Sequence, residues 1–294
     1  MLDTIIMIMT PGRLPRLNHF KTMQKRKVLF NKFIELRRAI YIILGTFDEL
    51  INRKNDFVVL YYHSINNDGW RFSVKPKEFK KQMRYMLKHY SNVDLEEVVT
   101  YLTKNNHNSK SSFLVTFDDG YKNLLEVAPY LMKLGVKPTL FVISDREKLV
   151  RKSIGTKRPL LSDDDLKKLM SLGWNIESHG KTHRRLTELT KDCLAEEIKE
   201  SKMDLERISG KNVVGFSYPH GKYSDVIIDA VKSAGYKIAF STDDIPFGSK
   251  ANKYAVPRVG VDGTHTFAEF KYLALPSVLA FRKLVKSTFL GRYL

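Results

Sequence analysis

The sequence predicts an α/β protein built from parallel β-α units, arranged in an open sheet or a barrel. Short apolar runs alternate with helical patterns along most of the 294 residues. Hydrophobic residues make up 43% of the chain, which suits one large α/β domain with additions, or two smaller domains. Polar residues follow four of the apolar runs, and the ends of parallel strands lie on one side of such a fold.

The N-terminal stretch 18–54 is predicted to be helical. Phe30, Phe33, Ile34 and Tyr41 recur there at helical spacing, with basic residues between them. Two interpretations stay open at this point. The helix either packs on the main domain or forms a basic amphipathic anchor at a membrane surface.

The first β-α units follow this helix. Pro76 suits the first turn of a helix whose apolar face includes Phe79 and Met86, and Gly135 ends a later helix. The stretch 144–160 is basic and loop-like, and no element is predicted in it. The predicted strands of this half are 57–62, 113–119 and 138–143, and the predicted helices are 76–90, 95–102 and 124–134.

The second half continues the alternation. Ser162 begins a helix with Asp163, Asp164 and Asp165 in its first turn, where capping and the helix dipole explain the three acids. The predicted strands that follow are 174–177, 213–218, 237–240 and 255–259, and the predicted helices are 191–208 and 224–234.

Two adjacent carboxylates, Asp118 and Asp119, stand at the end of the strand that begins at 113, with Gly120 after them. Taken alone, this triplet fits a turn with solvated aspartates. A strand that carries two acids to its own tip also fits a ligand site, since buried carboxylates need a partner or a cation. Other strand ends favour the second interpretation. His63, His179 with His183, and His220 follow three more of the predicted strands.

The spacing of His179 and His183, four residues apart, allows both rings to bind one metal ion. Two imidazoles and one carboxylate leave a coordination position open for water, as in hydrolytic zinc centres. A metal lowers the pKa of bound water, and a second carboxylate can accept the proton. The sequence therefore predicts that Asp118 and Asp119 have different tasks.

These motifs resemble a known family. The segments 116–120 and 178–183 are similar to the first two motifs of the polysaccharide deacetylases, which have the NodB-homology fold of carbohydrate esterase family 4. The segment 216–221 resembles the third motif. The stretches 58–64 and 256–259 resemble strands of the poly-N-acetylglucosamine deacetylase branch. The resemblance covers roughly residues 57–262 and is specific in its two metal motifs.

The resemblance implies a distorted TIM-like (β/α) barrel of about seven parallel strands. It divides the chain into a basic helical extension (1–55), a deacetylase domain (56–265) and a basic amphipathic segment (266–294). It further implies one divalent metal ion, in most of the family Zn²⁺, bound by Asp119, His179 and His183. Asp118 is then the general base. Substrate and oxyanion contacts are expected from Tyr218, Pro219, His220 with its backbone N–H, and Arg258.

The sequence departs from the family pattern in two roles, that of the residue that steadies the base and that of the general acid. Ser217 stands where many members have an arginine that steadies the base, and Arg258 is expected to replace it. The segment 242–244 lacks the tryptophan of another motif. The general acid is not evident, because His265 has the wrong surroundings. By analogy with the branch, His63 on the first strand is expected to take this role.

The resemblance implies an enzyme that removes N-acetyl groups from an N-acetylated amino-sugar glycan or a lipid-linked glycan intermediate, releasing acetate. Alternatives are a hydrolase of a non-sugar amide on the same fold and an inactive member that binds glycan. A nucleic-acid-binding protein is suggested only by the net charge of +18, without any supporting motif, and no nucleic-acid partner is expected.

The charge lies partly at the ends of the chain. Residues 1–55 carry +7 and residues 266–294 carry +4, which suits an anionic surface such as phospholipid, a phosphate-bearing substrate or nucleic acid, and is also consistent with ordinary solubilising charge. The apolar stretch 2–10 is too short to span a membrane and lacks the features of a signal peptide. The single cysteine, Cys193, permits no internal disulfide. We therefore expect a cytoplasmic protein that binds peripherally to the inner face of the membrane.

Overall fold

The computed structural model describes residues 15–104, 111–149, 151–248 and 251–288. Its centre is a curled sheet of parallel strands in the order β10-β1-β5-β6-β7-β8-β9, with the short β4 beside the start of β5. The expected barrel of about seven parallel strands with helical extensions is confirmed. The strands are β1 (Phe57–Tyr62), β4 (Ser91–Asn92), β5 (Ser112–Asp119), β6 (Thr139–Val142), β7 (Asn175–Ser178), β8 (Gly215–Ser217), β9 (Ile238–Phe240) and β10 (Val259–Gly260).

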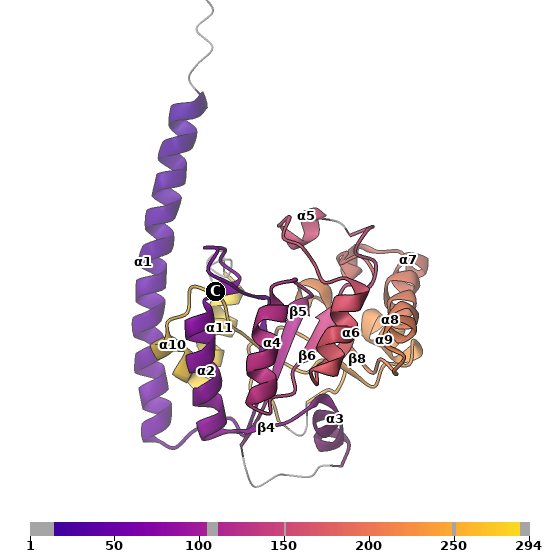
Figure 1. Ribbon diagram of the computed structural model, residues 1–294. Helices are drawn as coiled ribbons and strands as arrows, with labels where there is room; N and C mark the ends of the chain where they lie inside the picture. The colour runs from indigo at the N-terminus through magenta and orange to yellow at the C-terminus, as the bar shows by residue number, and fades with distance from the viewer. Residues whose placement is uncertain (1–14, 105–110, 150, 249–250, 289–294) are drawn as a thin grey trace, which may run out of the picture.

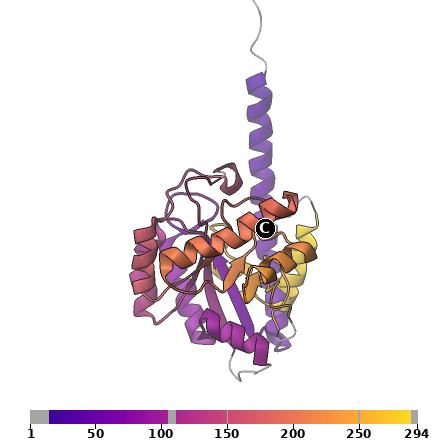
Figure 2. The same cartoon turned by 90° about the vertical axis from the view of Figure 1, so that its right-hand side faces the viewer.

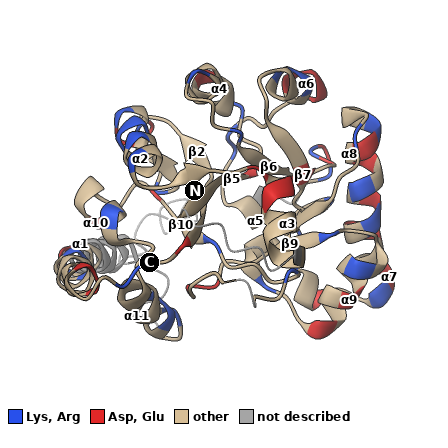
Figure 3. Ribbon diagram, turned by 90° about the horizontal axis from the view of Figure 1, so that it is seen from below, with Lys and Arg blue, Asp and Glu red and all other residues tan. Residues whose placement is uncertain are grey.

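Helices cover the outside of the sheet. Seen from below, α2, α4, α6, α8 and α9 surround the strands, while α1, α10 and α11 lie together on one side (Figure 3). The helices are α1 (Pro15–Leu50), α2 (Pro76–His89), α3 (Leu95–Lys104), α4 (Leu124–Lys133), α5 (Arg151–Ile154), α6 (Asp163–Ser171), α7 (Lys191–Ala195), α8 (Ser201–Ser209), α9 (Asp225–Ser233), α10 (Phe267–Tyr272) and α11 (Pro276–Lys286). A π-helical turn, Glu196–Glu200, joins α7 to α8.

The barrel has an apolar core on each side of its sheet. Alternate residues of the strands point inward, where Phe57, Leu114 and Phe141 belong to one buried cluster. Their neighbours, such as Leu60 and Phe117, point outward and pack under the helices. The two open edges of the sheet are joined by Val256, whose backbone exchanges hydrogen bonds with the strand β9. The sheet is therefore fixed in its curled form.

Several predicted boundaries were wrong. The strand predicted at 255–259 is only Val259–Gly260, because Pro257 has no N–H to donate to a ladder. The strand predicted at 213–218 is limited to β8, because the N–H groups of Val213 and Val214 bond to glutamate side chains instead. The short α5 and α10, and the two-stranded pair β2 (Ser64–Ile65) with β3 (Ser73–Val74), were not predicted.

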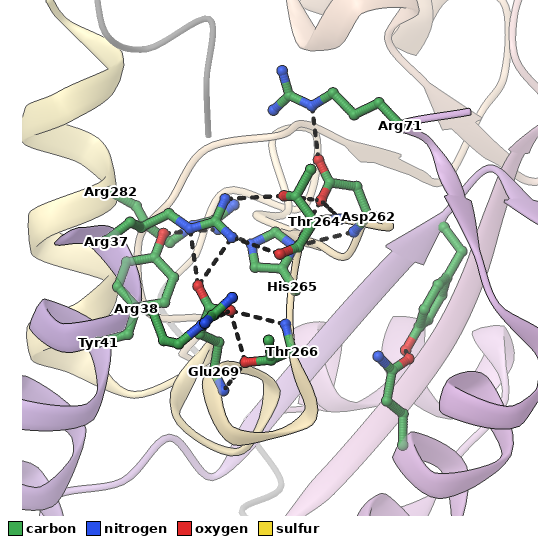
Figure 4. A network of polar contacts seen from close by, with 12 residues as sticks. Arg37, Arg38, Tyr41, Arg71, Asp262, Thr264, His265, Thr266, Glu269 and Arg282 are labelled. Atoms are coloured by element: carbon green, nitrogen blue, oxygen red, sulfur yellow. Dashed lines mark hydrogen bonds and ion pairs between the residues drawn. The ribbon is translucent and has the colours of Figure 1, made fainter. Parts of the chain in front are cut away.

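The helix α1 packs against the barrel through buried charge (Figure 4). Arg37 is fully buried, and its guanidinium donates to Glu269 Oε1 at 3.0 Å and to the carbonyl of Thr264 at 3.0 Å. His265 stacks on Tyr41 in the same network. This part of the chain is thus a packed surface between α1, α10 and α11.

The first part of α1 extends beyond the body of the molecule in both views (Figure 1, Figure 2). Within the part of the chain that the structure describes, no helix combines the length and the apolar character needed to cross a bilayer. The apolar stretch 2–10 lies outside the described residues.

Candidate metal and active site

The end of β5 carries the two carboxylates into the protein. Asp118 and Asp119 are both buried, and Asp119 has the left-handed backbone conformation with φ 69°. Gly120 follows with φ 87°, and a Cβ atom there would lie 2.7 Å from Val142 Cγ2. Only glycine fits this position, and the tight turn that results points the two acids in different directions.

Asp119 faces the two predicted histidine ligands. His179 Nε2 lies 3.5 Å and His183 Nε2 3.4 Å from Asp119 Oδ1. These distances match the edge of a tetrahedron with arms of about 2.1 Å, roughly 3.4 Å, which is the geometry of a zinc site. Asp119 Oδ1 is buried and has no hydrogen-bond partner, while Oδ2 accepts from the hydroxyl of Tyr121 at 2.9 Å. The cluster therefore has the donor atoms and the unsatisfied oxygen that a metal ion requires.

The Nδ1 atom of each imidazole has a polar partner that orients the ring. His179 Nδ1 donates to the carbonyl of Ser217 at 2.8 Å, which leaves the lone pair of Nε2 directed at Asp119. His183 Nδ1 lies 2.8 Å from the hydroxyl of Ser153 in α5. Burial lowers the pKa of His179 to about 4 and that of His183 to about 3. Both rings are thus neutral near pH 7, as metal ligands must be.

Asp118 is held by a buried arginine. Arg258 donates from Nη1 to Asp118 Oδ1 and from Nη2 to Asp118 Oδ2, both at 2.7 Å, and also to the hydroxyl of Ser217 at 2.7 Å. Burial alone would raise the pKa of Asp118, but the Arg258 guanidinium outweighs it, and the pKa lies below its ordinary value of 3.8. Asp118 therefore remains a carboxylate at neutral pH, beside the three-residue cluster.

A cavity of about 300 Å³ opens over these groups. His63 lies in its wall with Tyr61 and Phe72, and Tyr218 and His220 line the other side. A larger hollow of about 700 Å³ lies at the opposite ends of the strands, beside Glu177, and contains none of the predicted site residues. The chemistry therefore points to the smaller cavity.

The remaining predicted residues lie around this cavity. The Tyr218 hydroxyl donates to the carbonyl of Tyr254 at 2.7 Å, and Pro219 is buried close to Gly180. His220 has a left-handed backbone, φ 60°, and its ring packs 4.6 Å from that of His183. Neither Pro219 nor Arg258 lines the cavity, and Arg258 lies behind Asp118.

Other residues of the site were missed by sequence reasoning. Tyr121 stands two residues after Asp119, and an aromatic hydroxyl so close to a predicted ligand could have been noticed. Ser153 lies in the basic stretch where no element was predicted, and its hydroxyl also lies 2.9 Å from His220 Nε2. Trp70 and Phe72 enter from the loop between β2 and β3. Nothing in their sequence spacing indicates that they reach the cavity.

Comparisons with known proteins show which family this chain is similar to. Residues 105–239 match the family model of polysaccharide deacetylases. YxkH of Bacillus subtilis, which carries the same family name, is 32% identical over 205 residues, or 69% of this chain and 70% of that one. The poly-β-1,6-N-acetyl-D-glucosamine N-deacetylase of Staphylococcus aureus is 24% identical over 220 residues, or 71% and 73%.

Two solved structures share the fold. The polysaccharide deacetylase-like BA0330 of Bacillus anthracis has a TM-score of 0.62 at 28% identity, covering 74% of this chain and 68% of that one. The deacetylase PplD of Streptococcus pyogenes, solved with acetate, has a TM-score of 0.65 at 22% identity, covering 75% and 98%. The similarity therefore extends over about three quarters of this chain.

Proposed function

Because this chain belongs to the polysaccharide deacetylase family, we propose that it is a metal-dependent hydrolase that removes N-acetyl groups from an N-acetylated amino-sugar glycan and releases acetate. One observation carries the proposal. Asp119, His179 and His183 converge on one point, while the neighbouring Asp118 is kept ionised by Arg258. The site thus contains a ligand set and a separate base.

Asp119, His179 and His183 would hold one divalent ion, for which Zn²⁺ fits the mixed nitrogen and oxygen donors best. Such an ion lowers the pKa of a bound water and polarises the amide carbonyl. The unsatisfied Oδ1 of Asp119 and the neutral imidazoles support this assignment.

Asp118 accepts the proton of the attacking water in this proposal. Arg258 holds both carboxylate oxygens of Asp118 and so fixes its direction and its charge. The backbone N–H of His220 helps to hold the oxyanion, and His63 in the cavity wall donates a proton to the leaving amine. Tyr218 shapes the substrate side of the cavity, with Pro219 next to it in the chain.

The test is acetate release from an N-acetylglucosamine oligomer by the purified chain, with and without a chelator. We expect release that stops when the metal is removed and returns with added Zn²⁺. Activity that a chelator does not affect would contradict the metal-dependent mechanism. Activity on non-sugar amides alone would contradict the glycan substrate.

We also propose that the protein binds peripherally to an anionic membrane at its cytoplasmic face, where it would meet a lipid-linked intermediate. Both ends of the chain are basic. One face of α1 turns away from the barrel, and Leu36, Ile43, Phe47 and Leu50 are 59%, 67%, 53% and 80% exposed there. At 100° per residue these four side chains form one stripe, distinct from the buried stripe that contains Arg37.

Co-sedimentation with vesicles tests this placement. The full chain should bind vesicles that contain anionic phospholipid, and replacing Ile43 and Phe47 by Ser should weaken binding without changing acetate release from a soluble oligomer. If the chain stays in the supernatant at every lipid composition, the membrane placement is wrong. Dimers that the same substitutions dissociate would assign the stripe to a second copy instead.

A further inference from the structure

The loop from His179 to His183 carries both histidine ligands but has no regular structure to hold it. Gly180 has φ 80° and His183 has φ 60°, a conformation that is sterically unfavourable for any residue other than glycine. Such a loop keeps its shape only if its surroundings determine it. The polar groups of its backbone therefore need fixed partners.

Two backbone carbonyl groups of the loop accept hydrogen bonds from the same neighbouring segment. The N–H of Ser144 donates to the carbonyl of Gly180 at 3.2 Å, and the N–H of Asp145 donates to that of Lys181 at 2.9 Å. Both donors follow the strand β6. This side of the loop is thus attached to the barrel itself.

The N–H groups of Lys181 and Thr182, between the two histidines, are satisfied by one carboxylate. Glu197 Oε2 accepts from the N–H of Lys181 at 3.1 Å and from the N–H of Thr182 at 2.9 Å, while Oε1 accepts from the Thr182 hydroxyl. Glu197 is only 3% exposed. Its partners all lie between the two histidine ligands, and hydrogen bonds to an ionised group are the stronger kind.

The helix segment that presents Glu197 is unusual. The π-helical turn Glu196–Glu200 interrupts an otherwise continuous helix that begins with α7 and ends with α8. Such turns are rare and occur mostly at functional sites. Here Glu196 and Glu200, on either side of Glu197, both receive the ammonium group of Lys181, at 2.8 and 2.5 Å. The π turn therefore directs three acids at one short loop.

We propose that Glu197 is a positioning residue for the metal site: its buried carboxylate fixes the backbone of Lys181 and Thr182 and thereby holds His179 and His183 at their common distance from Asp119. Glu197 does not line the cavity and touches neither substrate nor metal. This inference rests on the metal site proposed above. Metal binding would then also depend on a residue that is not itself a ligand and that lies about fifteen residues further along the chain than the loop.

The experiment compares Glu197→Ala and Glu197→Gln with Glu196→Ala, in which an acid of the same π turn is removed that binds only the Lys181 side chain. The affinity for Zn²⁺ is measured by competition with a chromophoric chelator, and the visible spectrum of the Co²⁺-loaded protein reports the ligand geometry. Urea unfolding of the metal-free variants shows whether each one folds.

We expect Glu197→Ala to bind Zn²⁺ about 10- to 100-fold more weakly and to change the Co²⁺ spectrum, as is typical when a group supporting a metal ligand is lost. Glu197→Gln can accept with only one oxygen and has no charge, so it should fall between Glu197→Ala and the wild type. Glu196→Ala should stay within about 2-fold of the wild type, because its carboxylate is half exposed.

Wild-type zinc affinity and an unchanged cobalt spectrum in Glu197→Gln would overturn the proposal, even if Glu197→Ala does not fold. An equal loss in Glu196→Ala would overturn it too, because the effect would then belong to the charge of the π turn. If the wild type binds neither ion, the metal site and the proposed function fail first. If it binds both and releases acetate while Glu197 has no influence, only this inference fails.

Discussion

Two arginines of this protein are fully buried and each holds a carboxylate, but their surroundings differ. At the packed surface, Arg37 of α1 bonds to Glu269 Oε1, and Glu269 Oε2 accepts from the N–H and the hydroxyl of Thr266, both at 2.8 Å. At the active site, Arg258 holds Asp118, and next to it Asp119 Oδ1 has no partner. In the first network both oxygens of Glu269 have hydrogen-bond partners (Figure 4).

This difference distinguishes a carboxylate that is buried for packing from one that is buried for function. Placing a carboxylate in the interior is costly, and the protein offsets this with an arginine in both regions. At the end of β5, by contrast, Asp119 Oδ1 is buried without a hydrogen-bond partner beside His179, whose neutral ring donates from Nδ1 to the carbonyl of Ser217. A carboxylate oxygen without a partner under an open cavity indicates a missing ligand, whereas a carboxylate with both oxygens satisfied indicates packing.

The largest effect is expected at Asp118 and His179. Asp118→Asn should keep its zinc affinity and lose turnover by about 10²- to 10⁴-fold, the usual contribution of a general base. His179→Ala should lose both zinc and turnover. Acetate release and zinc content, measured on the same preparations, check the two outcomes. Substantial turnover in Asp118→Asn would show that another group takes the proton.

The next effect tests the packed surface. Arg37→Met removes one member of a buried pair and leaves Glu269 with only the partly exposed Arg38, 3.7 Å away, as a cation; breaking a buried pair costs about 3–5 kcal/mol of unfolding free energy. Zinc affinity should not change, because none of the described contacts of Arg37 reaches the cavity. Urea denaturation and metal titration measure the two quantities. A parallel loss of zinc affinity would mean that the two regions are coupled.

A substitution of Asp119 is expected to raise the unfolding free energy, whereas the substitution of Arg37 lowers it. In the metal-free protein Asp119→Asn removes an unsatisfied buried oxygen, and its amide can donate to the lone pair of His179 Nε2. We expect a gain of roughly 1–3 kcal/mol in unfolding free energy. Added zinc should then stabilise the wild type but not the variant. The matched control is Glu269→Gln, which should lose stability because Arg37 becomes unpaired. A loss in both variants would remove the distinction between the regions.

The residues alone predicted an open sheet or a barrel, and the family resemblance implied the barrel. The sequence also predicted that the candidate metal ligands lie together, because a parallel sheet places its strand ends on one side whatever lies between them. The sequence could not predict hydrogen-bond partners whose positions depend on how the chain folds between the strands. Glu197 and Ser153 reach the histidines from a π turn and from a stretch without any pattern. Arg37 was correctly placed on a helix, but which face of that helix is buried depends on α10 and α11, which pack against it from more than 200 residues away.

The smallest effect concerns another buried carboxylate, Glu177, which accepts from the N–H groups of Val214 and Gly215 and has no hydrogen bond to an arginine among the described residues. Burial raises its pKa from 4.5 to about 8. The folded state therefore binds a proton that the unfolded state has lost. The resulting stabilisation is complete below pH 4.5 and declines until it is gone above pH 8. From pH 7 to pH 9 the wild type should lose roughly 1 kcal/mol of unfolding free energy relative to Glu177→Gln, which cannot ionise. Parallel pH profiles for the two proteins would mean that Glu177 is already ionised in the folded state, held by its backbone donors much as Asp118 is held by Arg258.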